Sequence, residues 1–372
     1  MSSNELLFKI VRKEKLINKS YLLTIEFVFT KNMFNRINET LRNLEVNSYV
    51  YLTTNYNLKL GQIYQSSFDK LEKLNLEKDS DEFDANFLPE DNIYLLVSRP
   101  KKYYKIDELL RFSDVYNDFD IELLKENYPY EDYELDVKVY NVKQGNMNTI
   151  HSRNGVILYD WGTDKPVLLK GFPIDLNLFD ITTIILSHHH FDHYSIFVKK
   201  NFPKLKFVII PDGVMSGSLS SFIKRHSGVK VVVVPLSSPR NVSYFGTFSN
   251  LHFYIGPKSS TSSNKNNEGI IVNVSSNKNI KSLTGDVYWY LYLQSLKLIS
   301  CDKKISFVVP HHGGNIGKIS KLVPLNFEKC IYSYGIPNRH GHPNPYTESM
   351  MYKYTKKRLD TCKINVYEYH KL

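Results

Sequence analysis

The sequence predicts an α/β protein in which a domain of two β-sheets flanked by helices follows a smaller α+β domain. From residue 135 onward, short apolar segments alternate with glycine, proline and asparagine residues, which is the pattern of strands. These strand-like segments outnumber the helix-like ones, as two sheets flanked by helices require. The first third instead mixes strand-like and helix-like segments, and it contains no histidine before His151.

The predicted N-terminal domain spans residues 1–134. Its apolar runs predict strands at residues 21–29, 48–52 and 92–97. The spacing of Ile37, Leu41 and Leu44 predicts a helix over residues 34–44. Two acidic stretches, residues 77–91 and 114–136, are either solvated loops or a face that docks on the basic remainder of the chain. The second of them is expected to link the two domains.

The predicted C-terminal domain spans residues 135–372. Its strands are expected at residues 137–142, 156–160, 182–186, 207–210, 231–234, 251–255, 270–274, 305–309 and 330–334. Helices are expected at residues 194–201, 215–226 and 346–357. The aromatic run at residues 288–292 has two interpretations. It is either the buried face of a helix or strand, or a surface on which the bases of a single strand stack.

A histidine-rich segment, residues 187–193, lies at the centre of this domain. It follows a short β-branched apolar run, so its histidines are expected where a buried strand ends. The spacing is His-X-His-X-Asp-His, formed by His188, His190, Asp192 and His193. Imidazole nitrogens and carboxylate oxygens are ligands that Zn²⁺ and Mn²⁺ accept, and four of them within six residues can serve two adjacent metals. The alternative is a surface loop that binds metal adventitiously.

This motif resembles the signature of the metallo-β-lactamase superfamily, and two further segments agree with that pattern. Residues 155–162 resemble the first motif of the family, a strand ending in Asp160, whose carboxylate braces the metal loops. Residues 281–286 resemble the strand whose terminal aspartate, Asp286, bridges two metals. The resemblance implies an αββα sandwich with the ligands on loops at one edge.

Three short segments are similar to the hydrolase domain of ComEC-type competence DNA-uptake proteins, a resemblance that covers about residues 137–350. Residues 140–146 are similar to its V-G-Q-G-D turn, residues 309–314 to its P-H-H-G-S element, and residues 338–343 to its N-x-Y-G-H-P element. Two positions depart from the pattern. Lys143 and Asn146 stand where this branch usually has glycine and aspartate.

The resemblance implies a centre that binds two divalent metal ions, Zn²⁺ or Mn²⁺. One site would consist of His188, His190 and His342, and the other of Asp192 and His193, with Asp286 between them and His311 as an extra ligand. The superfamily has a further ligand histidine before Asp286, for which only His226 and His252 are available, and neither lies in a recognisable motif. His311 or His312 is the alternative for that position. Asp192 would also accept a proton from the attacking water, and Asp160 is counted with it as catalytic.

The resemblance and the charge distribution together favour a metal-dependent phosphodiesterase or nuclease that acts on nucleic acid or a nucleotide. Residues 1–136 contain 18 Lys and Arg against 25 Asp and Glu, a net charge of −7. Because the whole chain has a net charge of +10, the remaining residues carry +17. A basic catalytic domain suggests an anionic substrate, although a lysine-rich surface can also serve only for solvation. Two other functions remain open: hydrolysis of a lactone, thioester or other acyl compound, and a non-catalytic regulatory role in which the N-terminal domain contacts a partner protein.

Composition and the N-terminal segment predict a soluble cytoplasmic protein without membrane association. The segment has no secretory signal pattern, and no apolar run of the chain is long enough to span a bilayer. The three cysteines, Cys301, Cys330 and Cys362, lack C-x-x-C spacing and are odd in number, which favours reduced thiols.

Overall fold

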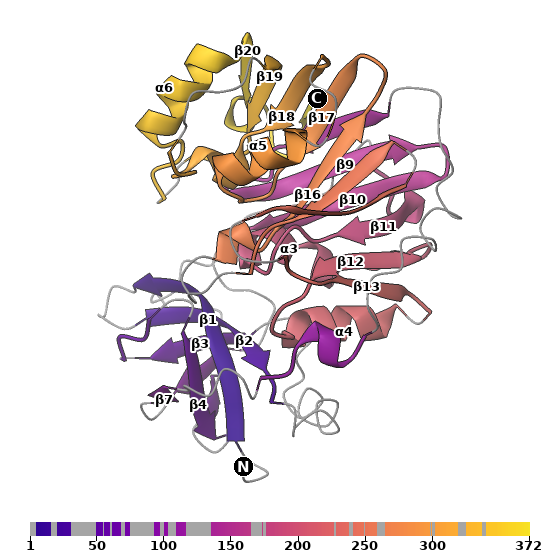
Figure 1. Cartoon of the computed structure of the whole chain (residues 1–372). Helices are drawn as coiled ribbons and strands as arrows, with labels where there is room; N and C mark the ends of the chain where they lie inside the picture. Colours follow the sequence, from indigo (N-terminus) through magenta and orange to yellow (C-terminus); the bar gives the residue numbers. More distant parts are fainter. Residues whose placement is uncertain are drawn as a thin grey trace. The chain divides into compact units, whose positions relative to one another are not determined.

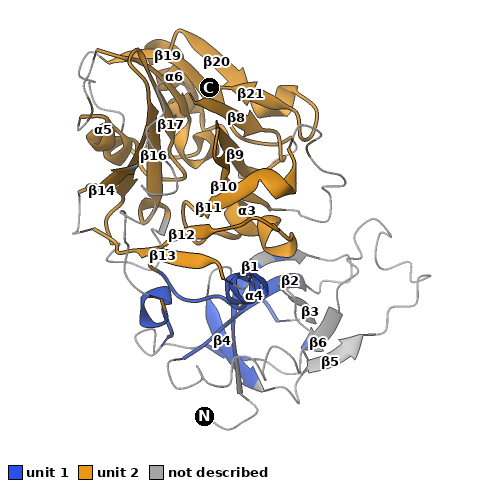
Figure 2. Ribbon diagram, turned by 90° about the vertical axis from the view of Figure 1, so that its right-hand side faces the viewer, with its two compact units in different colours: residues 1–115, 213–227 blue, residues 116–212, 228–372 orange. Residues whose placement is uncertain are grey.

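The computed structural model forms two compact units (Figure 2), unit 1 from residues 1–115 with 213–227 and unit 2 from residues 116–212 with 228–372. The residues that the structure describes are 5–15, 21–30, 50–54, 56–59, 62–67, 71–74, 93–96, 100–102, 109–116, 135–164, 173, 176–226, 228–237, 241–248, 250–258, 265–297, 299, 302–318, 325–336 and 340–372.

The first sheet of unit 2 has the strand order β13-β12-β11-β10-β9-β8-β21 (Figure 1). Its strands are β8 (Asp136–Tyr140), β9 (Gly145–Ser152), β10 (Gly155–Thr163), β11 (Ile181–Ile185), β12 (Phe207–Pro211), β13 (Lys230–Val234) and β21 (Tyr369–Lys371). Strands β10 to β13 run parallel, whereas the pairs on the other side of β10 are antiparallel. The parallel strands β11 and β12 are buried throughout, which is why they appear in the sequence as continuous apolar runs.

The second sheet of unit 2 has the order β14-β15-β16-β17-β18-β19-β20. Its strands are β14 (Ser243–Phe248), β15 (Leu251–Ile255), β16 (Ile270–Ser275), β17 (Asn279–Leu283), β18 (Lys304–Val308), β19 (Asn326–Tyr332) and β20 (Lys357–Asp360). Here too one part, β17 to β20, is parallel, and the remaining pairs are antiparallel. Polar residues that follow β17 and β18 therefore emerge at the same edge of this sheet.

The two sheets pack face to face around one apolar core. Ile157, Ile185 and Ile209 of the first sheet belong to the same buried cluster as Phe253 and Val272 of the second. Burying each such side chain contributes about 1.5–3 kcal/mol, so this core is the main force that holds the sheets together. The αββα sandwich that the sequence predicts is thus confirmed in its central layers.

Helices cover the outer faces of the sandwich. Helices α5 (Trp289–Lys297) and α6 (Pro345–Tyr354) belong to a second apolar cluster on the outer face of the second sheet (Figure 1). In α5, Trp289 packs against Phe307 of β18 and Phe327 of β19. Of the aromatic run, Trp289 and Tyr292 are fully buried, so the interpretation as a buried helix face is confirmed for these two side chains. On the first sheet, the short helix α3 (Phe191–Tyr194) contacts β10 and β9.

The strands predicted for residues 135–372 are confirmed within one to four residues at their ends, as are the helices at residues 215–226 and 346–357. The helix predicted at residues 194–201 is wrong. Helix α3 begins at Phe191, inside the histidine-rich segment, and only the 3₁₀ turn η7 (Phe197–Lys199) falls in the predicted range. The remaining 3₁₀ turns of unit 2 are η6 (Leu178–Asp180), η8 (Lys265–Asn267), η9 (Pro310–Gly313) and η10 (Thr361–Lys363).

Unit 1 contains a third sheet, with the strand order β5-β6-β3-β2-β1-β4-β7. Its strands are β1 (Glu5–Lys15), β2 (Tyr21–Val28), β3 (Val50–Thr54), β4 (Ile63–Ser67), β5 (Leu71–Leu74), β6 (Ile93–Leu96) and β7 (Lys101–Lys102), and a 3₁₀ turn η4 (Phe112–Asp114) follows. The three strands predicted in this region correspond to β2, β3 and β6. The predicted helix at residues 34–44 lies outside the described residues. Among the described residues, no helix has the length and apolar composition needed to cross a membrane.

Residues 213–227 leave unit 2 after β12 and join unit 1 before the chain returns to β13. Helix α4 (Gly217–Arg225) lies in this segment. Ser216 and Val214 form β-bridges with Val28 and Arg111, and the Ser218 hydroxyl donates to the buried carboxylate of Glu26. The two units are therefore not consecutive in sequence. The predicted domain boundary at residues 134/135 adjoins residues 117–134, which lie outside the described residues, so that boundary stays a prediction.

Deleting residues 1–134 should destabilise the remaining chain, because it removes the unit 1 partners of residues 213–227. The comparison protein has the same deletion, and its residues 213–227 are replaced by a glycine and serine linker of equal length. We expect the melting temperature of the simple deletion to be about 4–8 °C below that of this comparison protein. This range corresponds to about 2 kcal/mol in a domain of this size. Differential scanning calorimetry of the two proteins measures the difference. Equal melting temperatures would show that the segment needs no partner from unit 1.

Candidate metal centre

Asp160 lies in a β-bulge of β10. The pairing between β10 and β9 shifts register between Tyr159 and Trp161, so Asp160 is the extra residue, and its φ of 58° is left-handed. Such a bulge turns a side chain away from the regular alternation of a strand. Here Tyr159 packs in the core between the sheets, whereas the fully buried Asp160 carboxylate points to the loop that carries the histidines.

The Asp160 carboxylate binds that loop at two points. Its Oδ1 accepts a hydrogen bond of 2.7 Å from the Ser187 backbone N–H, directly after β11. Its Oδ2 lies 2.8 Å from Nδ1 of His193 in helix α3. The Ser187 hydroxyl connects the same elements, since its Oγ is 3.0 Å from Nδ1 of His188 and 3.1 Å from Nδ1 of His193. With Nδ1 bound on this side, each imidazole presents Nε2 to the opposite side.

Helix α3 can approach β10 only because residue 162 is glycine. A Cβ atom at Gly162 would lie 2.5 Å from the backbone N of Tyr194 and 2.6 Å from the carbonyl carbon of Asp192. No other residue type fits such an approach without displacing the backbone. The predicted motif at residues 155–162 therefore has two functions: its aspartate binds the histidine loop, and its glycine allows the helix with Asp192 and His193 to pack on the strand.

The second sheet contributes Asp286, which is separated from the end of β17 by two residues. The backbone turns at Gly285, whose φ is 55°, and a Cβ atom there would lie 2.9 Å from Cβ of Ser187. Only glycine combines this conformation with this contact. The turn brings the Asp286 carboxylate, which is 3% exposed, to the histidines of the first sheet.

His311 and His312 follow β18 in the turn η9, and both have left-handed backbone conformations, with φ of 52° and 54°. Consecutive non-glycine residues in this region store strain of about 1–3 kcal/mol each, which is typical of functional sites. His312 is buried, and its Nδ1 is 2.7 Å from the carbonyl O of Ser333, which leaves Nε2 facing Asp286.

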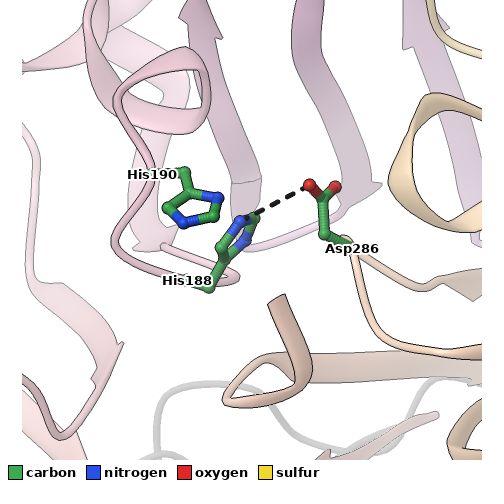
Figure 3. A group of neighbouring side chains, drawn as sticks. All are labelled: His188, His190 and Asp286. Carbon is green, nitrogen blue, oxygen red and sulfur yellow. Dashed lines mark ion pairs between the residues drawn. The ribbon is translucent and has the colours of Figure 1, made fainter. Parts of the chain in front are cut away.

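The two oxygens of Asp286 divide the centre into two groups of donors. Oδ2 lies 3.6 Å from Nε2 of His188, and Oδ1 lies 3.3 Å from Nε2 of His193 and 3.7 Å from Nε2 of His312. The first group is His188, His190 and Asp286 (Figure 3), and the second is Asp192, His193 and His312. Within each group the donor atoms lie within 4.8 Å of one another. Asp286 thus stands where a carboxylate can bridge two cations.

Charges within the centre shift its pKa values strongly. Burial and the neighbouring His193 lower the pKa of His188 well below its usual value. Burial also opposes ionisation of His193, but the carboxylates of Asp286 and Asp160 outweigh it and raise the pKa of His193. Against the effect of burial, His193 likewise lowers the pKa of Asp192 and Asp286. The carboxylates remain ionised at neutral pH, so this buried cluster needs positive charge, from protons or from cations.

The donor set fits divalent metal ions. Nε2 of His188, His193 and His312 and Oδ1 of Asp286 are buried and make no hydrogen bond with any described residue. Buried polar atoms normally have hydrogen-bond partners. Several buried nitrogen and oxygen atoms without such partners, all facing one space, indicate a binding site for a cation. Imidazole and carboxylate are the ligands that zinc and manganese prefer. The first group would hold one ion and the second another, each sharing an oxygen of Asp286.

The sequence-predicted ligands His188, His190, Asp192, His193 and Asp286 are brought together, but His311 and His342 lie in neither group. Nε2 of His311 is 3.2 Å from Nδ2 of Asn266 and 3.9 Å from Oδ2 of Asp286. The His342 ring stacks on His312, with centroids 6.1 Å apart, and burial and the nearby His312 lower its pKa to about 3. Their roles as ligands stay predictions. Asp160 contacts His193 from behind and does not face the donor space, so its geometry is that of a positioning residue.

The sequence leaves open whether His311 or His312 belongs to the centre. In the structure, His312 is the one that lies in the second group. The spacing of two adjacent histidines after a strand gives no basis for choosing between them. The choice depends on two consecutive left-handed residues, which sequence patterns do not reveal. In the sequence Asn146 is distinctive only as a departure from a family pattern, yet its Nδ2 donates a 3.0 Å hydrogen bond to Oδ2 of Asp160.

Replacing His312 by alanine should remove one of two metal ions, whereas replacing His311 should leave both. His312 completes the second group, whereas Nε2 of His311 is occupied by Asn266. Elemental analysis after Zn²⁺ loading and gel filtration measures the ratio of metal to protein, and the matched pair differs by one position in the same turn. If His311→Ala lost an ion and His312→Ala did not, His311 would be the ligand.

Comparisons with known proteins agree with this local pattern. The family model of the metallo-β-lactamase superfamily matches residues 140–195, which include Asp160 and the whole histidine-rich segment. No curated protein matches the chain by sequence.

Several solved structures are similar at low identity. The metallo-β-lactamase fold protein YhfI from Bacillus subtilis is 11% identical, with a TM-score of 0.37, over 64% of this chain and 100% of its own. The short form of human tRNase Z is 13% identical, with a TM-score of 0.37, over 63% of this chain and 98% of its own. Zn²⁺-bound PqqB from Methylobacterium extorquens is 10% identical, with a TM-score of 0.34, over 58% of this chain and 86% of its own. The family model alone bears out the superfamily resemblance predicted from the sequence, and it does so over residues 140–195.

Proposed function

We propose that the protein is a two-metal hydrolase that cleaves phosphodiester bonds of nucleic acid or of a nucleotide. The observation that carries this proposal is the position of Asp286, whose two carboxylate oxygens face two separate groups of buried donors. A single four-coordinate cation could not use six converging side chains. Two adjacent divalent ions, zinc or manganese, lower the pKa of a shared water, orient it and neutralise charge on the leaving oxygen.

Each side chain of the centre has a distinct part in this proposal. His188 and His190 would hold the first ion, His193 and His312 would hold the second, and Asp286 would contribute to both. Of the two carboxylates in these groups, Asp192 is the more exposed: its side chain is 25% exposed against 4% for Asp286, and its Oδ2 lies 3.5 Å from Nε2 of His312. It is the carboxylate that both reaches the second group and opens toward solvent. We therefore assign it the acceptance of a proton from the attacking water, within a substrate-accessible part of the centre.

Charge supports an anionic substrate. Residues 137–372 carry a net charge of +17, and a positive field attracts phosphates and accelerates their encounter with the site. The ComEC-type resemblance favours nucleic acid among the anionic substrates. All six donors of the two groups are present, which a non-catalytic homologue would have less reason to retain. The histidines of the two groups all lie outside residues 1–115 and 213–227, so unit 1 supplies none of them, and contact with a partner protein is the role we propose for it.

Replacing Asp286 by asparagine should reduce phosphodiester hydrolysis at least 100-fold while leaving the fold intact, because a neutral amide cannot bridge two cations. Asp192→Asn should reduce turnover by a similar factor, about 10²–10⁴, as expected when a general base is lost. Asp302→Asn, the same change at an exposed aspartate in a loop before β18, is the matched control. The assay uses Zn²⁺ and Mn²⁺ with single- and double-stranded DNA, RNA, cyclic dinucleotides, bis-p-nitrophenyl phosphate, lactones and thioesters. Turnover of acyl substrates alone would replace the phosphodiesterase proposal by an acyl hydrolase.

Binding of a polymeric substrate should weaken steeply with salt. Each phosphate neutralised on a single strand contributes a slope of about −0.7 in log K against log salt, so four contacts give roughly −3. Fluorescence anisotropy of labelled single-stranded DNA and RNA with the inactive Asp286→Asn variant, between low and physiological salt, measures this slope. A flat dependence, or no binding at low salt, would leave a mononucleotide as the substrate.

A further inference from the structure

Two buried asparagines of β9 lie behind the second donor group. Nδ2 of Asn148 donates to Oδ1 of Asn146 at 2.9 Å, and Nδ2 of Asn146 donates to Oδ2 of Asp160 at 3.0 Å. Both side chains are almost completely buried, at 0% and 3% exposure. The two residues are separated by one position, so they face the same side of the strand. They pair with Tyr159 and Gly162, on either side of the bulge at Asp160.

The direction of this chain of hydrogen bonds is fixed by its last member. An ionised carboxylate can only accept hydrogen bonds. Asn146 must therefore present its amide NH₂ to Asp160, so its amide oxygen faces away and accepts from Asn148. For the same reason Nδ1 of His193, 2.8 Å from the same Oδ2, must donate. Its Nε2, 3.3 Å from Oδ1 of Asp286, is then the nitrogen that carries a free lone pair toward the donor space when the ring is neutral.

Oδ2 of Asp160 is thus held between two donors, Asn146 on one side and His193 on the other. Oδ1 is held by the backbone N–H of Ser187. Without the amide of Asn146, the carboxylate would have only donors from the histidine loop itself. The backbone of Asp160 belongs to β10, but the rotation of its carboxylate would then be set by the loop whose His193 ring it orients. Asn146 is the member of this set that belongs to β9 and is fixed independently of the loop.

We propose that Asn146 is a positioning residue for the second donor group, orienting His193 through Asp160. The inference rests on the metal centre proposed above and extends it to a residue that faces no metal. Groups that orient a metal-binding histidine in this way usually change metal affinity by about 10–100-fold. The effect should be unequal between the two ions, because His193 belongs to the second group and His188 and His190 belong to the first.

The decisive variant is Asn146→Leu, which keeps the approximate shape of the side chain and removes its donor. It leaves Oδ2 of Asp160 without the donor from β9. The matched control is Asn273→Leu in β16. Asn273 is also fully buried and donates to a neighbouring hydroxyl, Oγ of Ser295, but it lies in the second sheet, paired with His252 and Ser282 of the adjacent strands.

Titration with Co²⁺, followed by its visible absorption, and with Zn²⁺, followed by calorimetry, measures the affinity of each ion separately from activity. We expect Asn146→Leu to weaken one ion by about 10–100-fold and to leave the other within about threefold. Asn273→Leu should change neither affinity. Unchanged affinities in Asn146→Leu, or an equal loss of both ions, would overturn the inference. Wild-type protein that binds no ion would instead refute the metal centre itself.

A second variant keeps the test valid if Asn146→Leu does not fold. Asn148→Ala removes the group that holds the amide oxygen of Asn146, one hydrogen bond further from the centre. We expect a smaller loss, about threefold to tenfold, confined to the same ion. Unchanged binding of both ions in a folded Asn148→Ala protein would count against the orienting chain.

Discussion

The centre depends on one constraint: a buried carboxylate, Asp286, must be surrounded by groups that supply positive charge. Two of its partners, His188 and His193, come from the other sheet, because they follow β11 whereas Asp286 follows β17. Ligands from two sheets converge only if those sheets pack in one register. The apolar core between them, which contains Ile185 and Leu283 near these strand ends, therefore determines the geometry of the site. Ile185 and Leu283 of this core lie only three residues from His188 and Asp286, so a change in the packing of the sheets would also move these side chains.

The backbone of the centre is strained where it must redirect side chains. Asp160, His311 and His312 all have positive φ angles, an uncommon state for residues other than glycine. At about 1–3 kcal/mol each, these conformations persist only where the surroundings enforce them. For Asp160 the hydrogen bond to the Ser187 N–H provides that enforcement, and for His312 the bond to the Ser333 carbonyl does so. Such strain at three points around one space is consistent with selection for a site over stability.

The sequence predicts nine of the strands described in unit 2 and five of the side chains that meet, because both depend on local patterns. Strands β9, β14, β20 and β21 are not among those nine, and β17 appears only through the family resemblance. A β-branched run followed by His-X-His-X-Asp-His places its ligands at a strand end whatever the rest of the fold. Features that depend on distant contacts were not predictable. Helix α3 begins at Phe191 since Gly162 of another strand leaves room for it. The choice of His312 over His311 depends on a strained turn, and the excursion of residues 213–227 into unit 1 depends on strands nearly 200 positions away.

The electrostatic balance explains why a second layer behind the ligands matters. Three aspartates, Asp160, Asp192 and Asp286, lie within reach of His193, and they raise its pKa against the effect of burial. A ring with that pKa competes between binding a proton and binding a metal, since only its deprotonated Nε2 can act as a ligand. Orientation then decides the outcome: a ring whose Nδ1 is fixed on Asp160 always offers Nε2 to the donor space. Asp160, held by the amide of Asn146, therefore keeps Nδ1 of His193 as the hydrogen-bond donor and leaves Nε2 as the nitrogen that faces the centre.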